Sequence, residues 1–401
     1  MNKQDQNNIK RNVRVLYVVN FFIGLIFWYG IEKIFLTKNL HLGPSVIAYI
    51  IVVYGLTQVL LNVPTGVLAD RWSRKGMVVV SLVILFASTT ILGSSHSLTQ
   101  YLIGTFGWGL YLVCITGTLE SLLYDGLKEQ GLARTYKKIY GRSQAIFMLG
   151  IFFSSTASGF IARSYGIRAA YYLTLISVLV AALAAMFLVE PVVHKQRTDT
   201  KVIPHMIEAL LRLKKSAVLT QIVIMSTMLF LVQTAFYEYA QLFYIAIFSA
   251  SAVATGIANG FGGLSLAVGN LITKHLHFAG SGFAFLGVLL AAAMVPGNPV
   301  VRVALFMMFG VVFGAVSANV NDLKHRKIPS HLRATLSSAI STIDYIIVIP
   351  LALVFSHLIA RYSIYWAYRA VAMTIVVYVV FYWLVGSKIL VLDQANDHPD
   401  R

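Results

Sequence analysis

Long apolar stretches alternate with short polar breaks along this chain, and the pattern predicts a bundle of membrane helices. An α-helix needs about twenty apolar residues to cross the hydrocarbon core of a bilayer. Twelve stretches of roughly this length occur, near residues 13–36, 44–69, 76–94, 98–127, 140–164, 167–189, 219–248, 251–275, 279–296, 300–323, 333–360 and 364–389. The predicted fold is therefore an all-α membrane protein with 12 transmembrane helices in two six-helix bundles.

The polar interval between the sixth and seventh stretches predicts where the two bundles meet. Residues 190–218 form the longest charged interval of the chain, so we expect an N-terminal bundle at 1–189 and a C-terminal bundle at 219–401. Within this linker, apolar residues recur at helical spacing over 203–211 and basic residues follow. That pattern predicts an interfacial helix lying on the inner leaflet.

The composition excludes a water-soluble protein, and the placement of charge excludes nucleic acid as a partner. Apolar residues make up 58% of the chain and charged residues 12%, whereas about a quarter of residues are charged in soluble domains. The net charge is +17, but 25 of the 32 Lys and Arg lie in alternate loops on the side of the amino terminus. This bias predicts a multi-pass protein of the cytoplasmic (inner) membrane with both termini in the cytoplasm.

One loop carries a recognisable motif. Residues 66–75, after the second stretch, read GVLADRWSRK. The loop resembles the G-x-L-A-D-R/K-x-G-R/K-R/K signature of the major facilitator superfamily of secondary transporters, with Ser73 in place of the second glycine. The run 120–125 is similar to the fourth helix of bacterial drug exporter-like members. The resemblance implies two bundles that rock about a site near the midplane.

The same resemblance implies a cytoplasmic gate. In exporter-like members an aspartate at the place of Asp125 pairs with the signature-loop arginine, here Arg74. We therefore expect a charge cluster that latches the cytoplasmic side in the outward-open state. Its residues are Gly66, Asp70, Arg71, Arg74, Lys75 and Asp125. A solvated ion pair of small energetic value is the alternative interpretation.

Other motifs give less specific information about the branch of that family that the chain resembles. Residues 269–275 resemble a degenerate second signature loop, with Thr273 where the aspartate would stand. Small residues at spacing four in the fifth stretch, Gly150, Ser154 and Ser158, predict close helix contact. That stretch lacks the glycine-proline pair of proton-antiport drug exporters, and the chain also lacks the signatures of sugar porters and proton-coupled peptide transporters.

Three acids inside the predicted spans are candidates for proton coupling. An ionisable side chain within a membrane is costly unless it faces water or a partner, so Glu120, Glu238 and Asp344 are functional candidates. Because burial disfavours the charged form of a carboxyl group, such an acid can serve as a proton acceptor. The alternative is that each acid is paired with a buried arginine or a backbone amide.

Polar and aromatic stripes on the predicted helices suggest a substrate cavity, since helices 1, 4, 7 and 10 line the passage in the family that the chain resembles. The candidates are Asn20, Trp28, Glu32, Thr116, Gln233, Tyr237, Gln241 and Tyr244. Such a wall would suit an amphiphilic or aromatic organic solute. Packing of these rings within the protein is the alternative.

Several kinds of chemistry are not expected. The single cysteine, Cys114, permits no disulfide within the chain, and the ten histidines show no metal-ligand spacing. No phosphate-binding loop and no nucleophile with a neighbouring base is visible, so we expect neither an enzyme nor a cofactor.

The sequence thus predicts a monomeric proton-coupled exporter of small amphiphilic compounds, with a small-molecule substrate, protons and membrane lipids as its partners. Three alternatives stay open. The chain could be a proton-coupled importer of a nutrient or organic acid, a lipid flippase, or a sensor that binds solute without transporting it.

Overall fold

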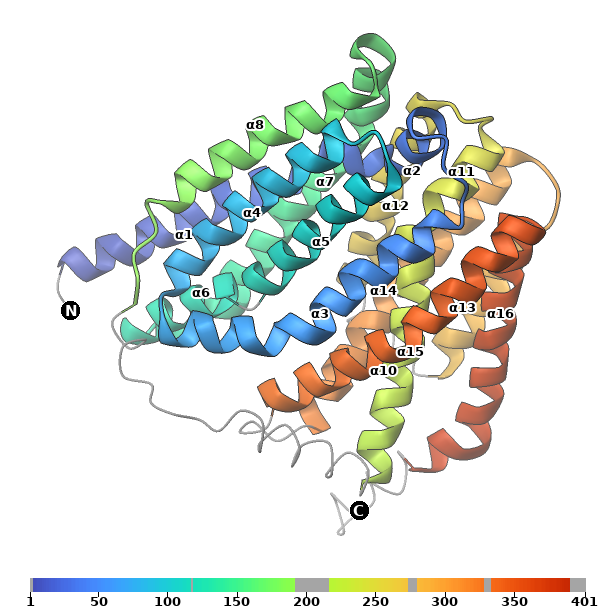
Figure 1. The fold of residues 1–401 in the computed structure, drawn as a ribbon. Helices are drawn as coiled ribbons and strands as arrows, with labels where there is room; N and C mark the ends of the chain where they lie inside the picture. Colours follow the sequence, from blue (N-terminus) through green and yellow to red (C-terminus); the bar gives the residue numbers. More distant parts are fainter. Residues whose placement is uncertain (1–2, 117, 192–215, 273–279, 328–332, 390–401) are drawn as a thin grey trace. The chain divides into compact units, whose positions relative to one another are not determined.

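A computed structural model describes residues 3–116, 118–191, 216–272, 280–327 and 333–389, which form helices and no strand. The chain divides into two compact units. Unit 1 comprises Met1–Thr200 and Ala250–Phe261, and unit 2 comprises Lys201–Ser249 and Gly262–Arg401. Most of unit 1 is blue to green in Figure 1, and most of unit 2 is yellow-green to red.

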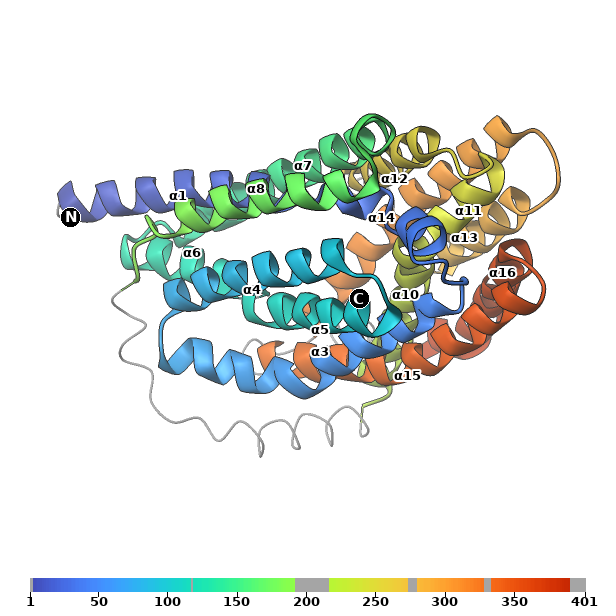
Figure 2. The same ribbon diagram turned by 45° about the horizontal axis from the view of Figure 1, so that its top comes forward.

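Unit 1 is built from two groups of three long helices. Its elements are α1 (Lys3–Gly24), η1 (Phe27–Gly30), α2 (Glu32–Ile34), η2 (Phe35–Asn39), α3 (Val46–Arg71), α4 (Arg74–Ser94), α5 (Leu98–Ile115), α6 (Thr118–Glu129), η3 (Ala133–Thr135), α7 (Tyr136–Tyr165), α8 (Ile167–Ala185) and the first half of α12 (Ala252–Ile272). Figure 2 shows α1, α7 and α8 side by side, with α3, α4 and α5 as a second group. Contacts between α4 and α8 join the groups around an aliphatic core that includes Val19, Leu82, Leu122 and Val178.

Unit 2 packs around a core of aromatic rings. Its elements are α10 (Ala217–Glu238), α11 (Ala240–Ile247), the second half of α12, α13 (Gly280–Ala293), α14 (Pro299–Lys327), α15 (Arg333–Arg361), α16 (Ile364–Phe381) and η7 (Tyr382–Gly386). The ring of Phe306 lies 5.5 Å from Phe236, 4.8 Å from Phe243 and 5.6 Å from Tyr368, measured between centroids. These contacts hold α10, α11, α14 and α16 together.

The helix lengths agree with a membrane protein. Within the described ranges, nine helices are long and apolar enough to cross a membrane, and Val46–Asn62 and Gly280–Ala293 are shorter apolar helices. The count of 12 spans stays a prediction. The predicted bundle boundaries also stay a prediction, and the expected interfacial helix at 203–215 lies outside the described residues.

The predicted continuous first helix is wrong, because α1 ends at Gly24 and 3₁₀, α and π segments follow. Distant side chains satisfy the backbone groups at the break. The amide of Phe27 donates to Oγ1 of Thr174 at 3.0 Å, and the hydroxyl of Ser154 donates to the carbonyl oxygen of Gly24 at 3.2 Å. These contacts offset the lost helical hydrogen bonds.

Two further predicted helices are also divided. The stretch 98–127 forms α5 and α6, with the break at Thr116, and the stretch 219–248 forms α10 and α11, with Tyr239 between them. The hydroxyl of Tyr239 is hydrogen-bonded to the hydroxyl of Ser356 at 2.8 Å and donates to the carbonyl oxygen of Ala352 at 3.1 Å. Hydrogen bonds between the Tyr239 side chain and α15 thus support the second break.

The close contact predicted for the fifth helix is confirmed. Gly150 of α7 lies so near α1 that a Cβ atom there would be 2.6 Å from the carbonyl oxygen of Phe21. Likewise, a Cβ atom on Gly24 of α1 would clash with the carbonyl oxygen of Phe147 in α7. Glycine therefore allows the two backbones to touch next to the end of α1.

Candidate functional site

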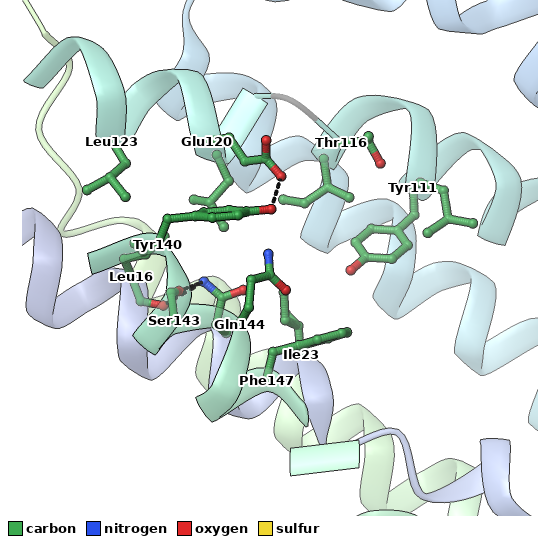
Figure 3. A pocket seen from close by; sticks show the side chains of 14 residues that line it. Leu16, Ile23, Tyr111, Thr116, Glu120, Leu123, Tyr140, Ser143, Gln144 and Phe147 are labelled. Carbon is green, nitrogen blue, oxygen red and sulfur yellow. Dashed lines mark hydrogen bonds between the residues drawn. The ribbon is translucent and has the colours of Figure 1, made fainter. Parts of the chain in front are cut away.

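Unit 1 contains a cavity of about 210 Å³ among α1, α5, α6 and α7 (Figure 3). The lining residues are Leu16, Asn20 and Ile23 of α1, Tyr111, Leu112 and Ile115 of α5, Thr116 at the break, Leu119, Glu120 and Leu123 of α6, and Tyr140, Ser143, Gln144 and Phe147 of α7. We call this cavity the unit 1 pocket. Its wall is mostly apolar, with one acid among uncharged polar groups.

The break at Thr116 places that acid, Glu120, in the first turn of α6. A carboxylate is favourable there, because the amino-terminal end of a helix carries a partial positive charge. The side chain is exposed, and the hydroxyl of Tyr140 donates to its Oε1 atom at 2.6 Å. Figure 3 shows this bond across the pocket from α7 to α6.

A second polar contact fixes the opposite wall. The amide of Asn20 donates to Oγ of Ser143 at 2.8 Å and to the carbonyl oxygen of Leu16 at 3.0 Å. Two of the eight predicted cavity residues, Asn20 and Thr116, therefore line the unit 1 pocket, together with the coupling candidate Glu120. The contribution of α7 was missed in the sequence, although Tyr140, Ser143, Gln144 and Phe147 have the spacing of one helical face.

Trp28 and Glu32 do not line the unit 1 pocket, because the break after α1 removes them from the stripe that holds Asn20. Their part in a substrate cavity stays a prediction. Trp28 is buried, with its ring stacked on Tyr171 at 5.5 Å. Glu32 is also buried and accepts hydrogen bonds from the hydroxyl of Tyr101 at 2.7 Å and from Nζ of Lys33 at 2.5 Å. Both belong to the packed interior of unit 1.

The four candidates from the seventh predicted helix do not form one open stripe. Gln233 is exposed and Tyr237 is half-buried, but Gln241 and Tyr244 are buried beyond the break at Tyr239. The break at Tyr239 therefore interrupts the predicted stripe, and the part of these four residues in a substrate cavity stays a prediction.

The two coupling candidates in unit 2 lie in different surroundings. Glu238 is half-buried at the last residue of α10. Asp344 of α15 is only 5% exposed and accepts hydrogen bonds from Ser226 at 2.9 Å and Thr227 at 2.7 Å, both in α10. Lys324 of α14 interacts electrostatically with the same carboxylate. These three partners could not be recognised from the sequence, because none is near Asp344 in the chain.

The signature loop forms a buried ion pair. Arg74, at the start of α4, pairs with Asp125 of α6, and both side chains are buried. Gly66, Asp70 and Arg71 lie in the last turns of α3, but their side chains fall outside the described part of the structure. Thr273 of the second loop also lies outside it.

Glu190, which the sequence pattern placed only in the linker between the bundles, completes this loop. Its carboxylate accepts hydrogen bonds from the backbone amides of Arg74 at 2.9 Å and Lys75 at 2.8 Å, and from the Ser73 hydroxyl at 2.8 Å. The Ser73 hydroxyl also accepts from the amide of Gly76 at 2.8 Å, as the N-cap of α4. Because the Ser73 backbone is extended (φ −165°), this position does not require glycine.

Among the described residues, no group of three or more His, Cys, Asp or Glu side chains is placed so that it could hold a metal ion. The geometry instead provides a cavity with one acid and a separate charged loop in unit 1, and a buried carboxylate in unit 2.

The family model of the Major Facilitator Superfamily matches residues 15–352. The chain belongs to the major facilitator superfamily. Its members are transporters, and this multi-pass membrane protein belongs to the family that its signature loop predicted.

Curated relatives are similar over part of their length. The chain is 24% identical over 190 residues to "Multidrug resistance protein 2" of Bacillus subtilis (strain 168), which covers 46% of this chain and 45% of the relative. It is 24% identical over 192 residues to an "Uncharacterized transporter" of Buchnera aphidicola subsp. Schizaphis graminum (strain Sg), covering 47% and 48%. The chain thus spans about half the length of the curated relatives it matches.

Solved structures show the fold over nearly the whole chain. The nucleoside transporter NupG superposes with a TM-score of 0.76 at 13% identity, covering 94% of this chain and 98% of that one. A D-xylose-proton symporter gives a TM-score of 0.74 at 14% identity, covering 94% and 97%. At these identities the likeness concerns the fold alone.

Proposed function

We propose that this transporter exports a small amphiphilic organic solute across the cytoplasmic membrane by alternating access, in exchange for protons. The observation that carries the proposal is the unit 1 pocket, which sets one acid, Glu120, into a largely apolar wall. The apolar wall suits the body of an amphiphile, and an exposed acid can exchange its proton with solvent. The similarity to multidrug resistance proteins supports the outward direction.

Glu120 is the foremost candidate for proton coupling. A coupling acid must meet both solvent and solute during the cycle, and Glu120 lies exposed in the unit 1 pocket. Asp344 is buried beneath two hydroxyl groups, and Glu238 is half-buried at a helix end. We assign these two acids supporting roles in the coupling.

The gate is proposed at the signature loop. The Arg74–Asp125 pair joins α4 to α6, and Glu190 joins the start of α4 to the segment after α8. Together with Gly66, Asp70, Arg71 and Lys75, these residues would latch the cytoplasmic side. The proposal includes cytoplasmic termini and a monomer surrounded by membrane lipids.

The test is solute uptake into liposomes that contain the purified protein, under imposed pH gradients. Exchange with protons predicts that an inside-acid gradient drives uptake, whichever way the protein is inserted. The solutes would be aromatic compounds of each charge: tetraphenylphosphonium, chloramphenicol and benzoate. Uptake driven by an outside-acid gradient would instead support a proton-coupled importer, which the missing glycine-proline pair of the fifth helix favours. Uptake that is the same under either gradient as without one would refute proton coupling.

A further inference from the structure

The charge of the unit 1 pocket points to the charge of its ligand. Among the described side chains that line it, Glu120 is the one charged group, and neither Lys, Arg nor His is present. An anionic solute would meet a carboxylate with no opposing cation among the described lining residues. A neutral solute would leave that carboxylate without a counter-charge as water is displaced, which is unfavourable.

The Glu120 carboxylate is also positioned to receive a ligand. Tyr140 holds it through a hydrogen bond to Oε1, and the side chain remains exposed at the pocket wall. Asn20 and Ser143 are hydrogen-bonded to each other across the wall. Among the polar groups of this wall, the acid is the strongest acceptor for a positive centre.

Aromatic rings extend from this acid between α6 and α7. The ring of Tyr140 is stacked on Tyr136 at 5.5 Å with an interplanar angle of 12°, and Tyr136 meets Tyr124 edge to face at 5.3 Å. Glu120 and Tyr124 are four residues apart on α6, as Tyr136 and Tyr140 are on α7. The faces of such rings attract organic cations, and the attraction increases where water is displaced.

We propose that the unit 1 pocket binds an organic monocation with an apolar body, its positive centre next to the Glu120 carboxylate and against a face of the Tyr140 ring. This inference rests on the proposed function in one respect, namely that the occupant is the transported solute. The apolar residues of α1 and α5 would contact the body of the solute. Tyr140 acts as a positioning residue, because it orients the carboxylate and offers its ring.

The experiment compares the binding of tetraphenylphosphonium and tetraphenylborate, which have nearly the same shape and opposite charge. Each ion is measured in a separate sample of purified protein by equilibrium dialysis, with protein-free detergent as the blank. We expect the cation to bind at least about tenfold more tightly than the anion. Equal binding of the two ions, tighter binding of the anion, or no binding of the cation would overturn the proposal.

Variants assign the cation to the pocket. Glu120→Gln should weaken cation binding by about 10- to 100-fold, whereas Glu120→Asp keeps the charge and should retain most of it. Glu129→Gln, in the same helix but outside the pocket wall, is the matched control and should bind as the parent does. Equal loss in the Gln and Asp variants, or loss in the control, would contradict a site at the Glu120 carboxylate.

Two changes at one position separate the ring from the hydroxyl. Tyr140→Leu should weaken binding by about 2- to 30-fold, while Tyr140→Phe keeps the ring and should lose less than about threefold. If Leu and Phe behave alike, the ring does not contact the cation.

The binding and transport experiments can refute the two proposals separately. Binding of the cation at Glu120 without pH-driven uptake would leave this inference intact and refute the proposed function. Proton-driven uptake of a neutral or anionic solute, with no binding of the cation, would do the reverse.

Discussion

Replacing Ser73 by glycine, the residue that the family signature has at this position, should destabilise unit 1. The Ser73 hydroxyl caps α4 through the amide of Gly76 and donates to the carboxylate of Glu190, both at 2.8 Å. Glycine in place of an N-cap serine costs a few tenths of a kcal/mol. Loss of a half-buried hydrogen bond to a charged group adds about 1 kcal/mol, giving a total of about 1.5 kcal/mol.

The only cysteine of the chain provides the assay. Cys114 is buried in α5, so a thiol-reactive fluorescent dye reports the unfolding of unit 1 on heating. A loss of 1 kcal/mol lowers Tm by about 2–4 °C in a domain of 150–250 residues, so Ser73→Gly should lower it by about 3–6 °C. Ser73→Thr keeps a hydroxyl and is the matched control, with an expected change below about 2 °C.

A double-mutant cycle tests the specific bond. Because Ser73 and Glu190 share a hydrogen bond, Ser73→Gly and Glu190→Gln should couple by about 0.5–1 kcal/mol. An unchanged or higher Tm for Ser73→Gly would refute the reasoning. Strict additivity of the two changes would show that the serine acts as a cap alone.

Three further outcomes follow from the structure. Gly150→Ala should lower the free energy of unfolding by about 1–3 kcal/mol, because the Cβ of the alanine would lie 2.6 Å from the carbonyl oxygen of Phe21. Gly141→Ala, in the same helix with nothing within 4 Å of a Cβ, should instead raise it by up to about 1 kcal/mol; equal effects would contradict the packing argument. Thr227→Val should lower the free energy of unfolding of the parent by about 1–3 kcal/mol. In the Asp344→Asn variant the same change should lower it much less, and unfolding in denaturant would measure both effects.

The sequence was sufficient for the parts of the fold that depend on local pattern. Apolar length predicted the helices, and the signature loop predicted the family. The small residues around Gly150 predicted the close contact of α7, because a missing side chain acts at the position where it is missing. The first helix shows the limit, since its apolar run continues through Gly24, and the side chains that support the break, Ser154 and Thr174, are 130 and 147 residues from their partners in the chain.

The candidate site was predictable to a similar extent. Glu120 stood out because an acid within an apolar stretch is a local anomaly, and Asn20 was found on its helical stripe. Trp28 shows the limit, since an aromatic residue gives the same sequence pattern whether it lines a cavity or stacks on a distant ring, as Trp28 does on Tyr171. Glu190 was overlooked because its partners at Ser73 and Arg74 are more than 110 residues away in the chain.

Proton movement in the Glu120→Gln variant is the most direct test of the central claim that this acid exchanges proton for solute. Liposomes containing the protein and a pH-sensitive dye would receive tetraphenylphosphonium outside, with the membrane potential clamped to zero. The parent and the Glu129→Gln control should lose protons from the lumen as the cation enters, and Glu120→Gln should show neither flux. Proton loss at the parent rate in Glu120→Gln would contradict the account.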